Sequence, residues 1–188
     1  MPIDNNYIET IIDEYEKYFK KYDLSAFEIQ TFIAFKYFLD NKVDIAIIEC
    51  GMGGELDATN IFKPIVSIIT SISIEHSSFL GESLSEIAAH KAGIIKEGIP
   101  VVVGSVSGDA LEVVIAKSKY ENAPLIMVDN FHNLKNDELG INFDYRPYIN
   151  LHISSYAEYS VMDACLAIEA LNQISDMFPL KENNLKIG

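Results

Sequence analysis

The chain opens with an amphipathic pattern in which large apolar residues return at helical spacing. They are Ile8, Ile11, Ile12, Tyr15, Phe19 and Tyr22. This period predicts a helix over residues 5–22. Ser25 and Glu28 have the spacing of a capping box, which predicts a second helix that begins there and ends near residue 40.

Farther along, short apolar runs bounded by turn residues alternate with helical patterns. The runs predict strands at 43–49, 66–70, 101–104 and 125–128. Ser83 and Glu86 form another capping box for a helix to about residue 97, and residues 108–121 have a helical pattern. Strands that alternate with helices predict an α/β fold, with a mostly parallel sheet flanked by helices.

The pattern changes over residues 131–154, which are polar and rich in Asn, Asp and Gly turn signals. This composition predicts a small antiparallel β segment. A last helix is expected over residues 157–177, and Pro179 ends it. We therefore expect one domain over residues 1–178, followed by a tail or the start of a linker at 179–188.

Charge and cysteine content narrow the range of partners and compartments. The 188 residues include 28 acids and 14 bases, for a net charge of −14, which argues against a nucleic-acid partner. Cys50 and Cys165 lie in apolar surroundings far apart in sequence, which favours a reduced, cytoplasmic protein. An acidic N-terminus argues against a signal peptide, and the lack of a long apolar run argues against a membrane partner.

The candidate chemistry is concentrated in residues 49–60, which read ECGMGGELDATN. A predicted strand ends in the carboxylate of Glu49 and opens into a glycine-rich turn, a pattern with which α/β sheets build ligand sites. Glycines let the backbone approach a ligand closely. Asp57, Thr59 and Asn60 then supply side-chain oxygens within the same turn.

This stretch resembles the folylpolyglutamate synthase and dihydrofolate synthase branch of the Mur ligase family, which has Glu-Val-Gly-x-Gly-Gly-Arg-x-Asp-Ala-Thr-Asn here. Further motifs agree in order, at residues 25–28 (SAFE), 69–76 (ITSISIEH), 80–88 (LGESLSEIA) and 91–96 (KAGIIK). The resemblance is strong from about residue 25 to 104. It implies a truncated Mur ligase central domain and an ATP-dependent amide ligase of folate metabolism that adds glutamate to dihydropteroate or folate.

The resemblance also implies cofactors and roles for individual residues. ATP is a co-substrate, and Mg²⁺ needs only one or two protein oxygen ligands. Glu49 and His76 correspond to the family's metal-binding residues, and Lys91 to a lysine that the family carries as a carbamate. Asp57, Thr59 and Asn60 correspond to the nucleotide-binding loop.

Each of these residues also has a structural interpretation. Glu49 is also consistent with a solvated carboxylate at the end of a strand. His76 is also consistent with a hydrogen-bonded histidine in a loop. Lys91 suits an ordinary helix surface, while Asp and Asn favour turns because they bond their own backbone.

Several departures from the family pattern argue that the isolated chain is inactive. The family's phosphate-binding P-loop lies upstream of the matched region, and this sequence contains no Gly-Lys dipeptide. Glu55 replaces an arginine, His90 replaces a glutamate, and residues 159–164 (YSVMDA) replace His-Gln-x-x-Asn-Ala. The family's C-terminal domain is not expected either.

Three possibilities therefore remain for the chain. It is a portion of a ligase that acts on folate or pteroate and glutamate, a truncated pseudoenzyme or binding domain, or one half of a split ligase. Without the family's first strand, which comes with the P-loop, the predicted strand after Val43 or its neighbour would expose apolar surface. This predicts self-association, a companion segment or cover by the helix at residues 5–22.

Overall fold

The computed structural model describes residues 2–74 and 77–179. The chain divides into two compact units, Met1–Phe62 and Lys63–Gly188. We describe each unit by itself. Among the described residues, no helix is long and apolar enough to cross a membrane.

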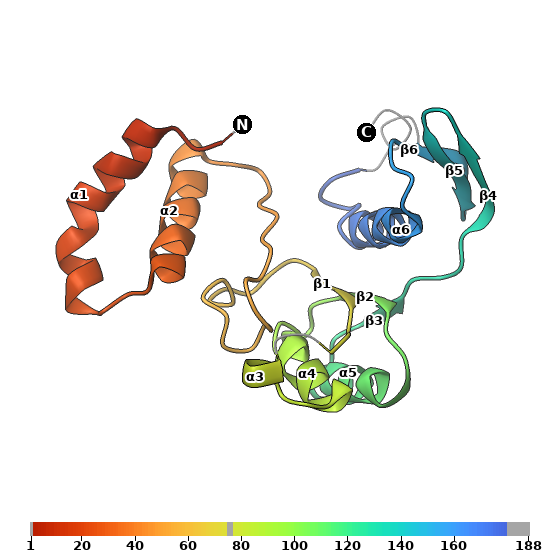
Figure 1. The fold of residues 1–188 in the computed structure, drawn as a ribbon, viewed down its shortest axis with the longest axis horizontal. Coiled ribbons are helices and arrows are strands. Elements are labelled where there is room, and N and C mark those ends of the chain that lie inside the picture. The colour runs from red at the N-terminus through yellow and green to blue at the C-terminus, as the bar shows by residue number, and fades with distance from the viewer. Residues whose placement is uncertain (1, 75–76, 180–188) are drawn as a thin grey trace. The chain divides into compact units, whose positions relative to one another are not determined.

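The first unit begins with two helices, α1 (Asn5–Lys21) and α2 (Ala26–Asn41), which lie close to their predicted positions (Figure 1). The predicted capping box is present, because the Glu28 amide donates to Ser25 Oγ and the Ser25 amide donates to Glu28 Oε2. Aromatic rings pack between the helices, with the Phe32 centroid 4.9 Å from that of Tyr15 and 5.4 Å from that of Phe19.

The strand predicted at residues 43–49 is wrong, because this segment has no regular secondary structure. Its apolar side chains are exposed instead of buried: Val43 and Ile45 are each 42% exposed, and Ile47 is 90% exposed. A strand needs backbone hydrogen bonds to a neighbour, and none of the residues that the structure describes pairs with this segment. The apolar pattern of residues 43–49 is therefore not sufficient to form a strand.

The second unit contains a parallel sheet of three strands, β1 (Ser67–Ser71), β2 (Val101–Ser105) and β3 (Leu125–Met127), in the order β1-β2-β3. Ser67 pairs with Val101, and Val101 pairs in turn with Leu125. These strands confirm three of the four predicted ones and the predicted α/β class with a parallel sheet.

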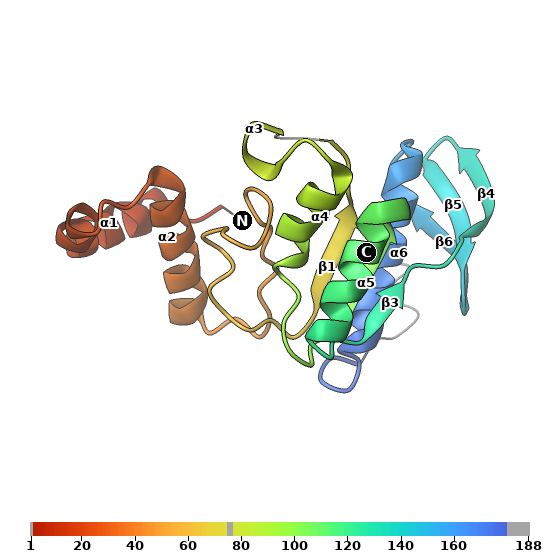
Figure 2. The same cartoon turned by 90° about the horizontal axis from the view of Figure 1, so that it is seen from below.

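Helices cover both faces of this sheet. Helices α4 (Leu84–Ala92) and α5 (Gly108–Tyr120) lie side by side on one face, and α6 (Glu158–Gln173) lies on the other (Figures 1 and 2). Val101 and Val103 are fully buried toward α4 and α5, while Val102 between them packs against Leu166 and Ala170 of α6. The strict alternation along β2 therefore explains why this strand is apolar throughout.

Helix α4 ends earlier than predicted, at Ala92 instead of near residue 97. The amides of Gly93, Ile94 and Ile95 bond carbonyls three residues back, so the helix tightens into turns there. A short helix that the sequence did not predict, α3 (Ser77–Leu80), precedes α4.

The predicted antiparallel segment is a separate sheet of three strands, β4 (His132–Asp137), β5 (Gly140–Tyr145) and β6 (Tyr148–Ile153). It packs on α6 through Val161, Cys165 and Ile168. Helix α6 thus contacts the parallel sheet with Leu166 and Ala170 and the antiparallel sheet with its other buried residues.

Candidate functional site

The glycine-rich loop at residues 50–60 is held in shape by Asp57. Its Oδ2 accepts a hydrogen bond from the Met52 amide at 2.8 Å, and its Oδ1 accepts from the Thr59 amide at 2.9 Å and the Thr59 hydroxyl at 2.5 Å. Thr59 is buried, and its hydroxyl also contacts the Cys50 sulfur at 3.6 Å. The two predicted ligand residues Asp57 and Thr59 therefore bond each other within the loop.

The electrostatics of Asp57 agree with this internal role. Burial alone would raise the pKa of the Asp57 carboxyl, but hydrogen bonds from the Thr59 hydroxyl and from backbone amides outweigh it and hold the pKa below its ordinary value. The carboxylate therefore stays ionised and keeps accepting these hydrogen bonds.

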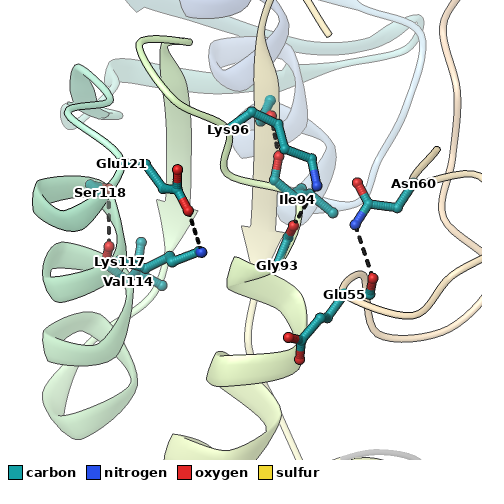
Figure 3. A network of polar contacts seen from close by, with 10 residues as sticks. Glu55, Asn60, Gly93, Ile94, Lys96, Val114, Lys117, Ser118 and Glu121 are labelled. Carbon is teal, nitrogen blue, oxygen red and sulfur yellow. Dashed lines mark hydrogen bonds and ion pairs between the residues drawn. The ribbon is translucent and has the colours of Figure 1, made fainter. Parts of the chain in front are cut away.

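Two glycines shape the start of the loop. A Cβ on Gly51 would lie 2.4 Å from the Phe27 ring, so a larger residue here would have to displace this side chain of α2. Gly53 has φ of 69°, in the left-handed region that favours glycine. At the end of the loop, the Asn60 side-chain amide donates to the Glu55 carbonyl at 3.2 Å (Figure 3).

Glu49 lies directly before this loop and is exposed. It does not stand at the end of a regular strand, so that part of its predicted setting is absent. Its carboxylate is the kind of hard oxygen ligand that Mg²⁺ prefers, and Mg²⁺ takes only one or two such groups from a protein. The exposed side chain of Glu49 is therefore compatible with a metal-binding role.

The other two predicted residues belong to the second unit. Lys91 is half-buried in the last turn of α4, directly after His90. His76 lies outside the described residues. From the sequence we expect Glu49, His76 and Lys91 to converge near the carboxyl ends of the strands, and this stays a prediction.

A groove that the sequence did not identify lies in the second unit, on the face of the parallel sheet that α6 covers. Its volume is about 640 Å³. The strands contribute Ile68, Thr70, Ser71 and Ser105, and α6 contributes Tyr159, Met162, Asp163, Leu166 and Ala167. Several of these residues stand at the carboxyl ends of β1 and β2, where α/β sheets bind ligands.

One signal in the sequence pointed toward this groove. Tyr159 and Asp163 belong to the segment that replaces the family's His-Gln-x-x-Asn-Ala motif, and the structure places both side chains at the groove. The close approach of the strands here also requires a glycine, because a Cβ on Gly104 would lie 2.4 Å from the Thr70 carbonyl oxygen.

Metal-ligating side chains do not gather into a cluster in the part of the chain that the structure describes. Within residues 2–74 and 77–179, no group of three or more His, Cys, Asp or Glu is placed to hold a metal ion. Both cysteines are free, and burial raises the pKa of the Cys165 thiol to about 12.

A parallel three-stranded sheet with helices on both faces, followed by a separate antiparallel sheet, places the chain in the class of α/β proteins. Within that class the chain belongs to the Mur ligase middle domain family, whose family model matches residues 6–170.

Proteins similar to the chain are folate ligases. It is 30% identical over 191 residues to the folylpolyglutamate synthase of Lacticaseibacillus casei, covering 97% of this chain and 45% of that protein. It is 36% identical over 154 residues to the dihydrofolate synthase/folylpolyglutamate synthase of Bacillus subtilis (strain 168), covering 78% of this chain and 36% of that protein.

A solved folylpolyglutamate synthase complex with AMPPCP and folate has the same fold. It superposes with a TM-score of 0.89 at 30% identity and covers 96% of this chain and 47% of that one. The chain thus spans less than half the length of the relatives it matches.

Proposed function

We propose that the chain is the middle-domain portion of an ATP-dependent ligase that joins glutamate to dihydropteroate or a folate. The observation that carries the proposal is the match to a folylpolyglutamate synthase with AMPPCP and folate bound, which extends over 96% of this chain. The glycine-rich loop supports it, because the internal hydrogen bonds of Asp57 hold the loop in one shape, and rigid groups stabilise the charge that develops during phosphoryl transfer.

The proposed roles follow from the chemistry of the side chains. Mg²⁺ would be held by Glu49 and His76, and when bound it neutralises charge on the phosphates of ATP. Asp57 and Thr59 fix the shape of the loop, and Asn60 closes its end. The Lys91 amine, as a carbamate, would add a negative group on α4.

A chimaera tests this function directly. The matched part of the Lacticaseibacillus casei enzyme is replaced by residues 6–170, and ATP-dependent incorporation of labelled glutamate into folate is measured. We expect ligation by the chimaera and a loss of about 10²-fold or more with Glu49→Gln. Glu9→Gln, an exposed change on α1, is the matched control. A folded chimaera that binds folate but never ligates glutamate would refute the proposal.

A second candidate is a non-catalytic binding domain. The observation that favours it is the exposed Asp163 at the groove, where the family motif has an amide, together with Glu55 in place of arginine. Calorimetry of the chimaera with Mg-AMPPCP, together with the labelled-glutamate assay with Mg-ATP, separates the two, because a binding domain would bind the nucleotide analogue but would not ligate glutamate.

A further inference from the structure

The antiparallel sheet is inserted between strand β3 and helix α6. Two short connections join it to the rest of the second unit, at residues 128–131 and 154–157. Its three strands form a sheet separate from the parallel one, and its buried side chains pack on Cys165 and its neighbours in α6 (Figure 2). A body that is joined by two connections and packed along one helix can move as a unit about those connections.

A hydrogen-bonded clasp lies within this contact. Tyr145 in β5 is fully buried, and its hydroxyl donates to Glu169 Oε1 on α6 at 2.6 Å. The same hydroxyl accepts a hydrogen bond from the Asp129 amide at 3.3 Å. A hydroxyl carries one hydrogen and the amide supplies its own, so the hydrogen of Tyr145 is directed to Glu169. The clasp thus joins β5, α6 and the connection that leads into the antiparallel sheet.

The chemistry of the clasp makes it strong and directional. Burial raises the pKa of the Tyr145 hydroxyl, and the half-buried carboxylate of Glu169 raises it further, so Tyr145 stays a hydrogen-bond donor. A hydrogen bond to a carboxylate is roughly twice as strong as one between neutral groups. The other oxygen of Glu169 lies 3.5 Å from Asn172 Nδ2, a long contact that adds little. Tyr145 therefore supplies a strong polar attachment of β5 to α6.

A cysteine thiol lies beneath the antiparallel sheet, next to the clasp. Cys165 precedes Glu169 by one turn of α6 and is fully buried. Burial and the nearby carboxylate raise the pKa of its thiol to about 12, and thiols react as thiolates, so Cys165 is inert while the sheet is docked. Opening of the sheet would restore ordinary thiol reactivity. The other cysteine, Cys50, is half-buried in the first unit and serves as an internal reference.

We propose that this clasp is a conformational lock on the antiparallel sheet. While the clasp is closed, the sheet stays docked on α6 and opens only together with it. Once the clasp is released, the sheet moves as a flap about residues 128–131 and 154–157 and uncovers Cys165. The parallel sheet keeps its own core against α4 and α5, so it does not open with the released flap. The inference goes beyond the proposed function, because it rests on contacts within the second unit alone.

Thiol labelling of the whole chain tests the lock. The rate at which iodoacetamide modifies Cys165 is followed by mass spectrometry of the peptides, which distinguishes the two cysteines. Tyr145→Phe removes the donor and leaves the carboxylate without this partner, so Cys165 should react about tenfold faster or more. Tyr148→Phe is the matched control, because its hydroxyl makes only a 3.5 Å contact with Asn172, and it should change the rate by less than about twofold.

Hydrogen exchange at the amides of β2 separates a lock from a general loss of stability. If the clasp is a lock, Tyr145→Phe accelerates the labelling of Cys165 more than it accelerates exchange in β2. Equal acceleration of both, or an unchanged labelling rate at Cys165, would overturn the proposal.

A second variant keeps the test decisive if Tyr145→Phe fails to fold by circular dichroism. Glu169→Gln keeps the size of the side chain and removes its charge, so Cys165 should react roughly three- to tenfold faster. Glu112→Gln, the same change at an exposed position of α5, is its control and leaves the rate unchanged. Labelling of the Glu169→Gln variant at the original rate, or in step with exchange in β2, would equally count against the lock.

Discussion

At the scale of single residues, Asp57 is the strongest determinant of the candidate loop. Asp57→Ala removes the acceptor of three hydrogen bonds, from the Met52 amide and from the amide and hydroxyl of Thr59. We expect a loss of about 1–2 kcal/mol, since the site is only partly buried. Hydrogen exchange at the Met52 and Thr59 amides should accelerate, whereas Asp44→Ala, an exposed change in the same unit, should leave both rates unchanged.

The same carboxylate predicts a pH dependence. The folded-state pKa of Asp57 is depressed, so its contribution to stability is present above the unfolded-state pKa and is lost as the pH falls through the folded-state value. Urea unfolding measured from pH 6 downward should show stability falling below about pH 4. Asp57→Asn should reduce that slope, and an unchanged slope would contradict the assignment.

The sequence identified Asp57, Thr59 and Asn60 as the important residues of the loop but not what they contact. Asp and Thr two positions apart can bond each other's backbone, and this structural interpretation is what the structure shows for the pair. A sequence pattern cannot separate a ligand oxygen from a loop-shaping one, because both require the same polar residue types in the same turn.

At the scale of elements, the capping box of α4 offers a direct test. The Glu86 amide donates to Ser83 Oγ, so Ser83→Ala should destabilise the protein by about 1 kcal/mol. Ser85→Ala, within the same helix, is the matched control and should be neutral or slightly stabilising because alanine favours helix. Equal effects of the two changes in urea unfolding would rule out the cap as the cause.

The capped helices and the buried strands that pair with a neighbour could be predicted from the sequence. The irregular structure of residues 43–49 could not. Local pattern records how apolar a segment is, whereas strand formation also depends on a neighbour far away in sequence. Helix α4 was overextended for a related reason. Residues 93–97 keep the helical apolar spacing, but the turns at Gly93 and Ile94 depend on tighter backbone bonds that periodicity does not show.

At the scale of the whole molecule, the isolated chain should not ligate glutamate at a measurable rate. Removing one donor to developing charge costs about 10²–10³ in rate, and this sequence contains no Gly-Lys dipeptide from which a P-loop could be built. A labelled-glutamate assay with Mg-ATP on the purified chain checks this. Turnover comparable to that of the full-length Lacticaseibacillus casei enzyme would mean that other groups hold the phosphates.

The position of helix α6 between two sheets predicts how the second unit unfolds locally. It packs against β2 through Leu166 and Ala170 and against the antiparallel sheet through Val161 and Cys165, so it contributes to the packing of both sheets. The two sheets share no strand, yet they should behave as one foldon. Amides in β2 and β5 should then become solvent-accessible in the same rare excursions, with similar opening free energies and similar sensitivity to urea.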